Sequence, residues 1–123
     1  MDQLVELVLF SNELTGSIPY SIFEATNLEI IALSDNKIEG HLSSRFDDLG
    51  KLRELYVWQN MLTGTVPDDF GNMPILEHFE FNNNDITGEV PSEVCALDLL
   101  TLYADCKGTS PQVECACCTM CWD

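Results

Sequence analysis

The chain has 123 residues, 46% of them hydrophobic, and its 21 acidic side chains outnumber 5 basic ones, giving a formal net charge of -16. This charge makes nucleic acid a poor partner, because nucleic-acid binding requires a basic surface. The length predicts one domain, and no stretch approaches the roughly 20 apolar residues of a membrane-spanning helix.

The start of the chain, MDQLVELVLF, leads directly into a repeated pattern. It lacks the basic region and the cleavage site of a signal peptide, and it offers no cysteine-bearing or amphipathic cap. We therefore expect either that the chain is a fragment of a longer protein or that another domain or partner covers its first repeat.

An asparagine and a glycine return at a constant interval along the chain, and apolar residues between them keep the same spacing. The repeated residues are Asn12, Asn36, Asn60 and Asn84, followed by Gly16, Gly40, Gly64 and Gly88. A period of this length, held over four copies, predicts a solenoid of stacked short coils.

Each repeat contains a short stretch in which apolar and outward residues alternate, as they do in a β-strand. Stacked copies would pair these strands in parallel about 4.8 Å apart. The asparagine amide can both donate and accept hydrogen bonds. We expect it to satisfy backbone groups of its own turn and of the next coil, which would otherwise be buried without partners.

The repeated phrases are LVELVLFSNELTGSIP, LEIIALSDNKIEGHLS, LRELYVWQNMLTGTVP and LEHFEFNNNDITGEVP. Over roughly residues 4 to 105 they resemble the plant-type, extracellular leucine-rich repeat, whose consensus is LxxLxLxxNxLxGxIP. The second repeat departs from it at His41-Leu42-Ser43. The resemblance implies an α/β solenoid, a right-handed arc with a short parallel β-sheet on its concave face and irregular or 3-10 segments on its convex face.

The repeats divide the chain into coils at residues 4–27, 28–51, 52–75 and 76–98, with a partial fifth coil. The fifth coil begins one position early: Leu99, Leu102 and Ala104 continue the apolar columns of Leu76, Phe79 and Phe81 after a slightly shorter step. We predict a repeat domain over residues 1–105 and a cysteine-rich cap over residues 106–123.

All six cysteines lie near the C-terminus: Cys95, Cys106, Cys115, Cys117, Cys118 and Cys121. An even number at one end predicts a disulfide-stapled cap formed in an oxidising compartment, with the pairing left open. Zinc is the weaker alternative, because the Cys118-x-x-Cys121 pair lacks a second well-spaced pair. The tail resembles the terminal cap of leucine-rich-repeat proteins of algae such as diatoms, in Ala104-Asp105-Cys106, Val113-Glu114-Cys115, Cys117-Cys118-Thr119 and Cys121.

Large aromatic side chains on the outward positions of the strands are typical of recognition surfaces. Acidic and amide side chains beside them would supply directional contacts. The competing interpretation is that these aromatics only pack across neighbouring strands. The predicted ligand-binding residues are Glu54, Tyr56, Trp58, His78, Glu80, Asn82 and Tyr103.

The chain contains no nucleophile elbow, phosphate loop or HExxH motif, so we expect no enzymatic activity, no cofactor and no bound metal. The resemblance implies an extracellular or cell-surface recognition module of a receptor-like or secreted protein, with a protein, peptide or glycan ligand. The alternatives are a secreted inhibitor of a polysaccharide-degrading enzyme, similar to polygalacturonase inhibitors, or an acidic adhesive or cell-wall component.

Overall fold

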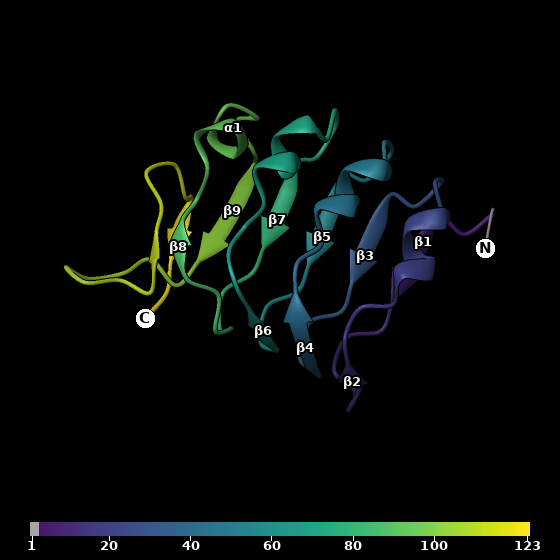
Figure 1. Ribbon diagram of the computed structural model, residues 1–123, viewed down its shortest axis with the longest axis horizontal. Coiled ribbons are helices and arrows are strands. Elements are labelled where there is room, and N and C mark those ends of the chain that lie inside the picture. The colour runs from purple at the N-terminus through teal and green to yellow at the C-terminus, as the bar shows by residue number, and fades with distance from the viewer. Residues whose placement is uncertain (1–2) are drawn as a thin grey trace.

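The computed structural model describes residues 3–123, so residues 1 and 2 of the predicted repeat domain lie outside it. The chain winds into stacked coils, and each coil adds one strand to a six-stranded parallel sheet (Figure 1). The sheet order follows the chain. Its strands are β1 (Glu6–Val8), β3 (Ile30–Ala32), β5 (Glu54–Tyr56), β7 (His78–Glu80), β9 (Thr101–Ala104) and β11 (Met120–Cys121).

The register of this sheet follows the sequence period. Leu7 pairs with Ile31, Ile31 with Leu55, and Leu55 with Phe79, each pair separated by one full repeat. Phe79 then pairs with Leu102, which confirms the shorter step into the fifth coil. The parallel sheet of the predicted leucine-rich-repeat arc is therefore present.

Short helices lie on the side of the coils opposite this sheet. They are η1 (Tyr20–Glu24), η2 (Ser44–Asp48), η3 (Asp68–Asn72) and α1 (Ser92–Cys95). The first three are 3-10 helices, as expected for the convex face, and the fourth is a short α-helix. None of the helices within residues 3–123 has the length and apolar character needed to cross a bilayer.

The departure of the second repeat from the consensus has a local explanation. Pro19, Pro67 and Pro91 precede the other helices with extended backbone, and Ser43 takes the same place before η2. The hydroxyl of Ser43 accepts a hydrogen bond from the backbone N–H of Arg45 at 3.1 Å. Serine therefore starts this helix by capping it, where proline starts the others by restricting the backbone.

A second set of strands, which the sequence did not predict, follows the asparagine turns. Its members are β2 (Thr15–Gly16), β4 (Lys37–His41) and β6 (Met61–Thr63) in one sheet, and β8 (Gly88–Glu89) paired with β10 (Val113–Glu114). The repeated glycines lie here with positive φ. At Gly64, where φ is 83°, an added Cβ would lie 2.5 Å from Nδ1 of His41. The positive φ therefore favours glycine at this position, and an added Cβ would also displace the exposed ring of His41.

The core runs between the sheet and the helices and is filled by the repeated apolar columns. Leu28, Leu52, Leu55 and Phe79 are fully buried in it. Phenylalanine rings extend through it from coil to coil, with centroids 5.5 Å apart between Phe46 and Phe70 and 5.1 Å apart between Phe70 and Phe79. Each coil is thus stabilised by apolar contact with its neighbours.

The repeated asparagines form a hydrogen-bonded ladder between coils. Nδ2 of Asn60 donates to the carbonyls of Val57, in its own turn, and of Leu33, in the preceding coil, at 3.1 and 3.0 Å. Its Oδ1 accepts from the backbone N–H of Ile38, also in the preceding coil, at 3.0 Å. The side chain therefore joins its turn to the coil before it, whereas the sequence pattern suggested the coil after it.

The cysteine-rich tail closes the C-terminal end of the stack. The predicted disulfides are confirmed, and the open question of their pairing has an answer: Cys95–Cys117, Cys106–Cys121 and Cys115–Cys118. The tail also supplies β10 and β11, which extend both sets of strands by one member. The exact division at residue 105 into repeats and cap stays a prediction.

Side chains near the tail complete the hydrogen bonds of the last full coil. Oδ1 and Oδ2 of Asp105 accept from the backbone N–H groups of Asn83 and Asn84 at 2.9 and 3.3 Å. Nε2 of Gln112 donates to the carbonyls of Asn84 and Ile86, both at 2.7 Å. These two side chains take the place of a following coil.

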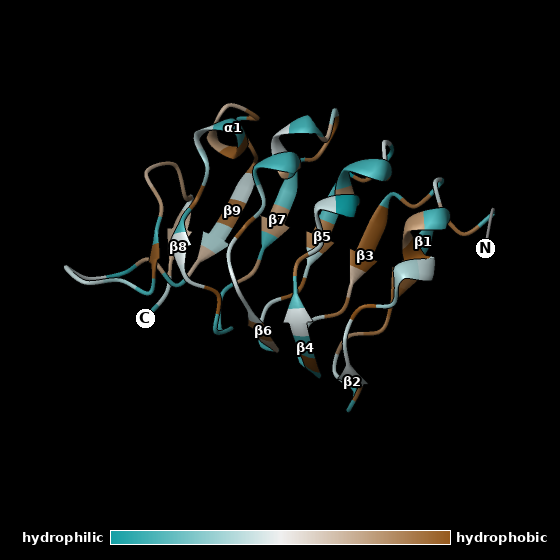
Figure 2. Cartoon of the chain, viewed as in Figure 1, coloured by the Kyte–Doolittle hydropathy of each residue, from teal (hydrophilic) through white to brown (hydrophobic). Residues whose placement is uncertain are grey.

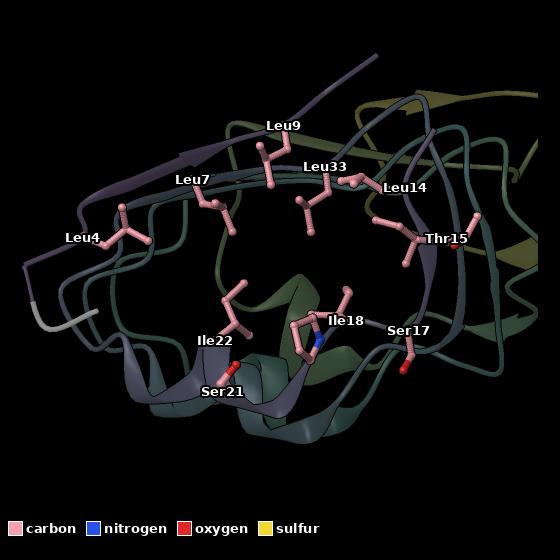
Figure 3. A pocket seen from close by; sticks show the side chains of 12 residues that line it. Leu4, Leu7, Leu9, Leu14, Thr15, Ser17, Ile18, Ser21, Ile22 and Leu33 are labelled. Atoms are coloured by element: carbon pink, nitrogen blue, oxygen red, sulfur yellow. The ribbon is translucent and has the colours of Figure 1, made fainter. Parts of the chain in front are cut away.

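The N-terminal end of the stack is open in the part of the chain that the structure describes. Figure 3 shows Leu4, Leu7 and Leu9 on one wall and Ile18 and Ile22 on the other, all directed into an apolar hollow of about 290 Å³. Within the described residues, the side-chain amide of Asn12 donates only to the carbonyls of Leu9 and Phe10 in its own turn, because no described coil precedes it.

Candidate functional site

The strands β5 and β7 place four of the predicted ligand-binding side chains next to one another on the concave face. Glu54 pairs with His78 and Tyr56 with Glu80 across the parallel strands, and all four are half-buried. The residues between them, Leu55 and Phe79, are fully buried in the core. The alternation of the strand therefore directs one set of side chains inward and the other set outward.

Hydrogen bonds hold this outward set in place. The Tyr56 hydroxyl donates to Oε1 of Glu54 at 2.7 Å, and the Thr101 hydroxyl donates to Oε2 of Glu80 at 2.9 Å. Since Thr101 uses its proton for Glu80, its oxygen accepts from Nδ1–H of His78, also at 2.9 Å. Nε2 of His78 then remains for a ligand.

The phenol of Tyr56 is held in its neutral form. Burial raises the pKa of Tyr56 above its ordinary value of 10.0, and the hydrogen bond to Glu54 and the negative charges of Glu54 and Glu80 raise it further. Desolvation and neighbouring negative charge both disfavour the phenolate. Tyr56 therefore stays a hydrogen-bond donor at any physiological pH.

Two carboxylates of the concave face, those of Glu54 and Glu80, are not neutralised by an ion pair within residues 3–123. Arg53 lies immediately before β5, with its Nε 3.4 Å from Oε1 of Glu29 and its Nη1 3.4 Å from Oε1 of Glu77, and so pairs with acids at the edge of the face. Among the described residues no ion pair reaches Glu54 or Glu80. The negative charge of the face is therefore available to a ligand.

Two hollows flank the indole of Trp58. We call the one toward the C-terminus the cap-side hollow; it has a volume of about 340 Å³. It is lined by Trp58, Gln59, Glu80, Asn82, Asn83, Tyr103 and Trp122. The other, also about 340 Å³, lies toward the N-terminus. It is lined by Phe10, Ala32, Ser34, Tyr56, Trp58 and Glu80. Trp58 and Glu80 thus belong to both hollows.

Asn82 is more buried than expected for a residue predicted to face outward on the concave side. Its side chain is 4% exposed, and that of Ser34, at the same position two strands earlier, is 1% exposed. These are short side chains on either side of the much larger Trp58, so they lie at the floor of the two hollows. Oδ1 of Asn82 and Oγ of Ser34 are buried without a hydrogen-bond partner, which is uncommon for buried polar atoms.

Trp122 lines the cap-side hollow but is not among the ligand-binding residues predicted from the sequence. The register of β11 pairs Met120 with Tyr103 and Cys121 with Ala104, so Trp122 occupies the position next to Asp105. Its backbone N–H donates to the carbonyl of Ala104 at 2.8 Å, which continues the ladder. The segment Met120-Cys121-Trp122 could have indicated a sixth strand, but the surrounding cysteines led to its interpretation as part of the cap alone.

Polar residues gather on the C-terminal half of the concave sheet. Figure 2 shows β3 as hydrophobic, whereas β7 is largely hydrophilic and β9 is of intermediate hydropathy. Within residues 3–123 no group of three His, Cys, Asp or Glu side chains is placed to hold a metal ion. The outward side chains here offer aromatic surfaces, hydrogen-bonding groups and negative charge.

Comparison with known proteins identifies the repeat. The leucine-rich repeat family model matches residues 51–73 and 76–97. No curated protein sequence matches the chain.

Solved structures of plant receptors are similar in fold to three quarters or more of this chain. The plant peptide hormone receptor RGFR1 in complex with RGF2 is 32% identical with a TM-score of 0.79, over 93% of this chain and 17% of that one. The ectodomain of GASSHO1/SCHENGEN3 from Arabidopsis thaliana, in complex with CASPARIAN STRIP INTEGRITY FACTOR 2, is 31% identical with a TM-score of 0.72, over 76% of this chain and 11% of that one.

The ectodomain of the receptor kinase SOBIR1, also from Arabidopsis thaliana, is 29% identical with a TM-score of 0.72, over 77% of this chain and 51% of that one. The chain thus spans about a tenth to a half of the length of these proteins. The family match, the repeat pattern and the register of the parallel strands together show that this chain is built of leucine-rich repeats.

Proposed function

We propose that this chain is an extracellular recognition module of a receptor-like or secreted protein, and that it binds a peptide segment on its concave face. The observation that carries the proposal is the group of half-buried aromatic and acidic side chains around two hollows, centred on Trp58 and Glu80. Aromatic side chains of this kind supply most of the binding energy in many interfaces.

Two further observations support this function. RGFR1 and GASSHO1/SCHENGEN3, both similar in fold, were solved in complex with RGF2 and with CASPARIAN STRIP INTEGRITY FACTOR 2. The three disulfides of the present chain are typical of proteins from oxidising compartments, which favours an extracellular location.

A random-sequence peptide library displayed on phage tests the proposal. Peptides selected on the wild-type chain should bind Trp58→Ala and Tyr56→Ala about tenfold or more weakly, because each change removes an aromatic contact. Tyr20→Ala is the matched control, since Tyr20 lies on η1 of the convex face and is 69% exposed. Circular dichroism should show the same fold in all three variants.

Unaltered affinity of the selected peptides for both concave-face variants would overturn the concave face as the binding surface. A library that yields no binding peptide at all would overturn the peptide ligand itself. If only Tyr20→Ala loses affinity for the selected peptides, the binding surface lies on the convex side and the proposal is wrong.

A further inference from the structure

We infer that the cap-side hollow binds a positively charged group, an arginine or lysine side chain. This hollow is then the part of the concave face that recognises the basic residue of a peptide ligand. The inference rests on the proposed function, because it names the part of the peptide that the concave face would recognise. Four features of the hollow support it: its walls, its charge, its floor and the lack of a competing base among its lining residues.

The walls of the hollow are two tryptophans at equivalent positions of the sheet. Trp58 follows β5 and Trp122 follows β11, so they stand three strands apart, with Asn82 and Asp105 at the positions between them. At a strand spacing of about 4.8 Å their backbones are about 14 Å apart. Both indoles line the same hollow, and indole faces attract cations more strongly than other aromatic rings do.

The charge of the hollow is negative. Glu80 lines it, and the hydrogen bond from Thr101 at 2.9 Å reaches only one of its carboxylate oxygens. Glu54 lies on the neighbouring strand, next to Tyr56, which pairs with Glu80. No lysine, arginine or histidine is among the described residues that line the hollow. An anionic ligand would therefore be repelled, and a cation would meet an unneutralised carboxylate.

The floor of the hollow offers an unused acceptor. Oδ1 of Asn82 is buried without a hydrogen-bond partner in a side chain that is 4% exposed. Gln59 and Asn83 add side-chain amides at the rim. A guanidinium group carries five N–H donors on a flat surface that also stacks on aromatic rings. Arginine therefore matches both the walls and the floor, whereas a purely apolar group would leave the floor without a partner.

The first test uses blocked arginine, N-acetyl-arginine methylamide, as the probe and measures the indole N–H signals by two-dimensional NMR. The chain has 2 tryptophans, so two signals report on the hollow, and Trp122→Phe assigns them. Blocked arginine should shift both signals, and blocked citrulline, which has the same shape without the charge, should not. Equal shifts with citrulline, or no shift with arginine, would overturn the inference.

The second test asks whether the charge acts locally. Glu80→Gln should weaken binding of blocked arginine roughly tenfold. Glu39→Gln removes the same charge from β4, outside the residues that line the hollow, and should leave binding within a factor of about two. Equal weakening by both variants would show that only the net charge of the chain matters, which would overturn the hollow as the site. Circular dichroism checks the fold of both variants.

The phage library separates this inference from the proposed function. Peptides selected on the wild-type chain should be rich in arginine or lysine, and should lose affinity for Trp122→Ala as well as for Trp58→Ala. Selected peptides that depend on Trp58 but contain no basic residue would leave the proposed function standing and overturn the inference. Binding of blocked arginine without any selected peptide would overturn the proposed function and leave the cation site standing.

Discussion

Oδ1 of Asp105 lies 2.9 Å from the backbone nitrogen of Asn83 and accepts its hydrogen bond. In the preceding coil the corresponding backbone N–H, that of Gln59, donates to the carbonyl of Asn82 in the next turn. The carboxylate of Asp105 therefore replaces a backbone carbonyl at the point where the repeats end. This exchange lets the last asparagine turn form without a full coil behind it.

Replacing Asp105 by alanine should lower the free energy of unfolding by about 2 kcal/mol, because two backbone N–H groups lose a charged acceptor. Urea denaturation followed by circular dichroism would measure the change. Asp85→Ala is the control, since the Asp85 side chain is exposed and makes no hydrogen bond within the described residues. Equal stability of the two variants would contradict the capping role of Asp105.

The asparagine ladder should be much more sensitive at its C-terminal end than at its N-terminal end. Asn84→Ala removes the partner of four backbone groups, the N–H of Leu62 and the carbonyls of Val57, Phe81 and Asn82, and should cost about 3 kcal/mol. Asn12→Ala loses only exposed contacts within its own turn and should cost less than about 1 kcal/mol. Thermal or urea denaturation compares the two, and a similar loss would refute the inter-coil role.

The disulfides should differ in their contributions according to the loops they close. Cys106–Cys121 spans 15 residues, so replacing both cysteines by serine should cost about 3 kcal/mol. Cys115–Cys118 spans 3 residues, and its removal should cost about 2 kcal/mol. Denaturant unfolding of the two double variants tests the order. The first variant should also move the indole signal of Trp122, which follows Cys121 directly.

Stability should fall at alkaline pH because of Tyr56. The folded chain raises the pKa of Tyr56 above 10.0, through burial first and the hydrogen bond to Glu54 second. Its contribution is thus fully present below pH 10.0, the ordinary value, and is lost as the pH rises toward the pKa of the folded state. Absorbance titration of the phenols should show one late transition that Tyr56→Phe removes. A titration with no such transition would contradict the buried hydrogen bond.

The sequence period was sufficient to predict the register of the main sheet. A strict repeat places equivalent residues side by side, so Leu55 beside Phe79 follows from their spacing alone. The shorter fifth coil could be predicted in the same way, because Leu102 and Ala104 are apolar at the right positions. The cysteines also indicated an oxidised cap, since six of them lie together at one end.

Other features depend on contacts between coils that a repeat pattern does not contain. Ser11, Asp35, Gln59 and Asn83 all have positive φ, although their side chains differ, because each occupies the same turn before a ladder asparagine. Asn82 is buried at a position that alternation alone directs outward, and the place of Trp122 depends on how the tail folds back onto β9. The disulfide pairing likewise follows from the positions of α1, β10 and β11.

The two ends of the stack differ, and within the described chain only the amino end has a surface on which further repeats could be stacked. At the amino end, another repeat could pack its apolar side chains against the walls around Leu7 and Ile22. The Asn12 amide, which donates only within its own turn, could also hydrogen-bond to that repeat. The carboxyl end is closed by Asp105, Gln112 and the disulfides. A protein engineer could therefore splice extra repeats ahead of Leu4 and widen the surface toward that side, while the cap-side hollow keeps its shape.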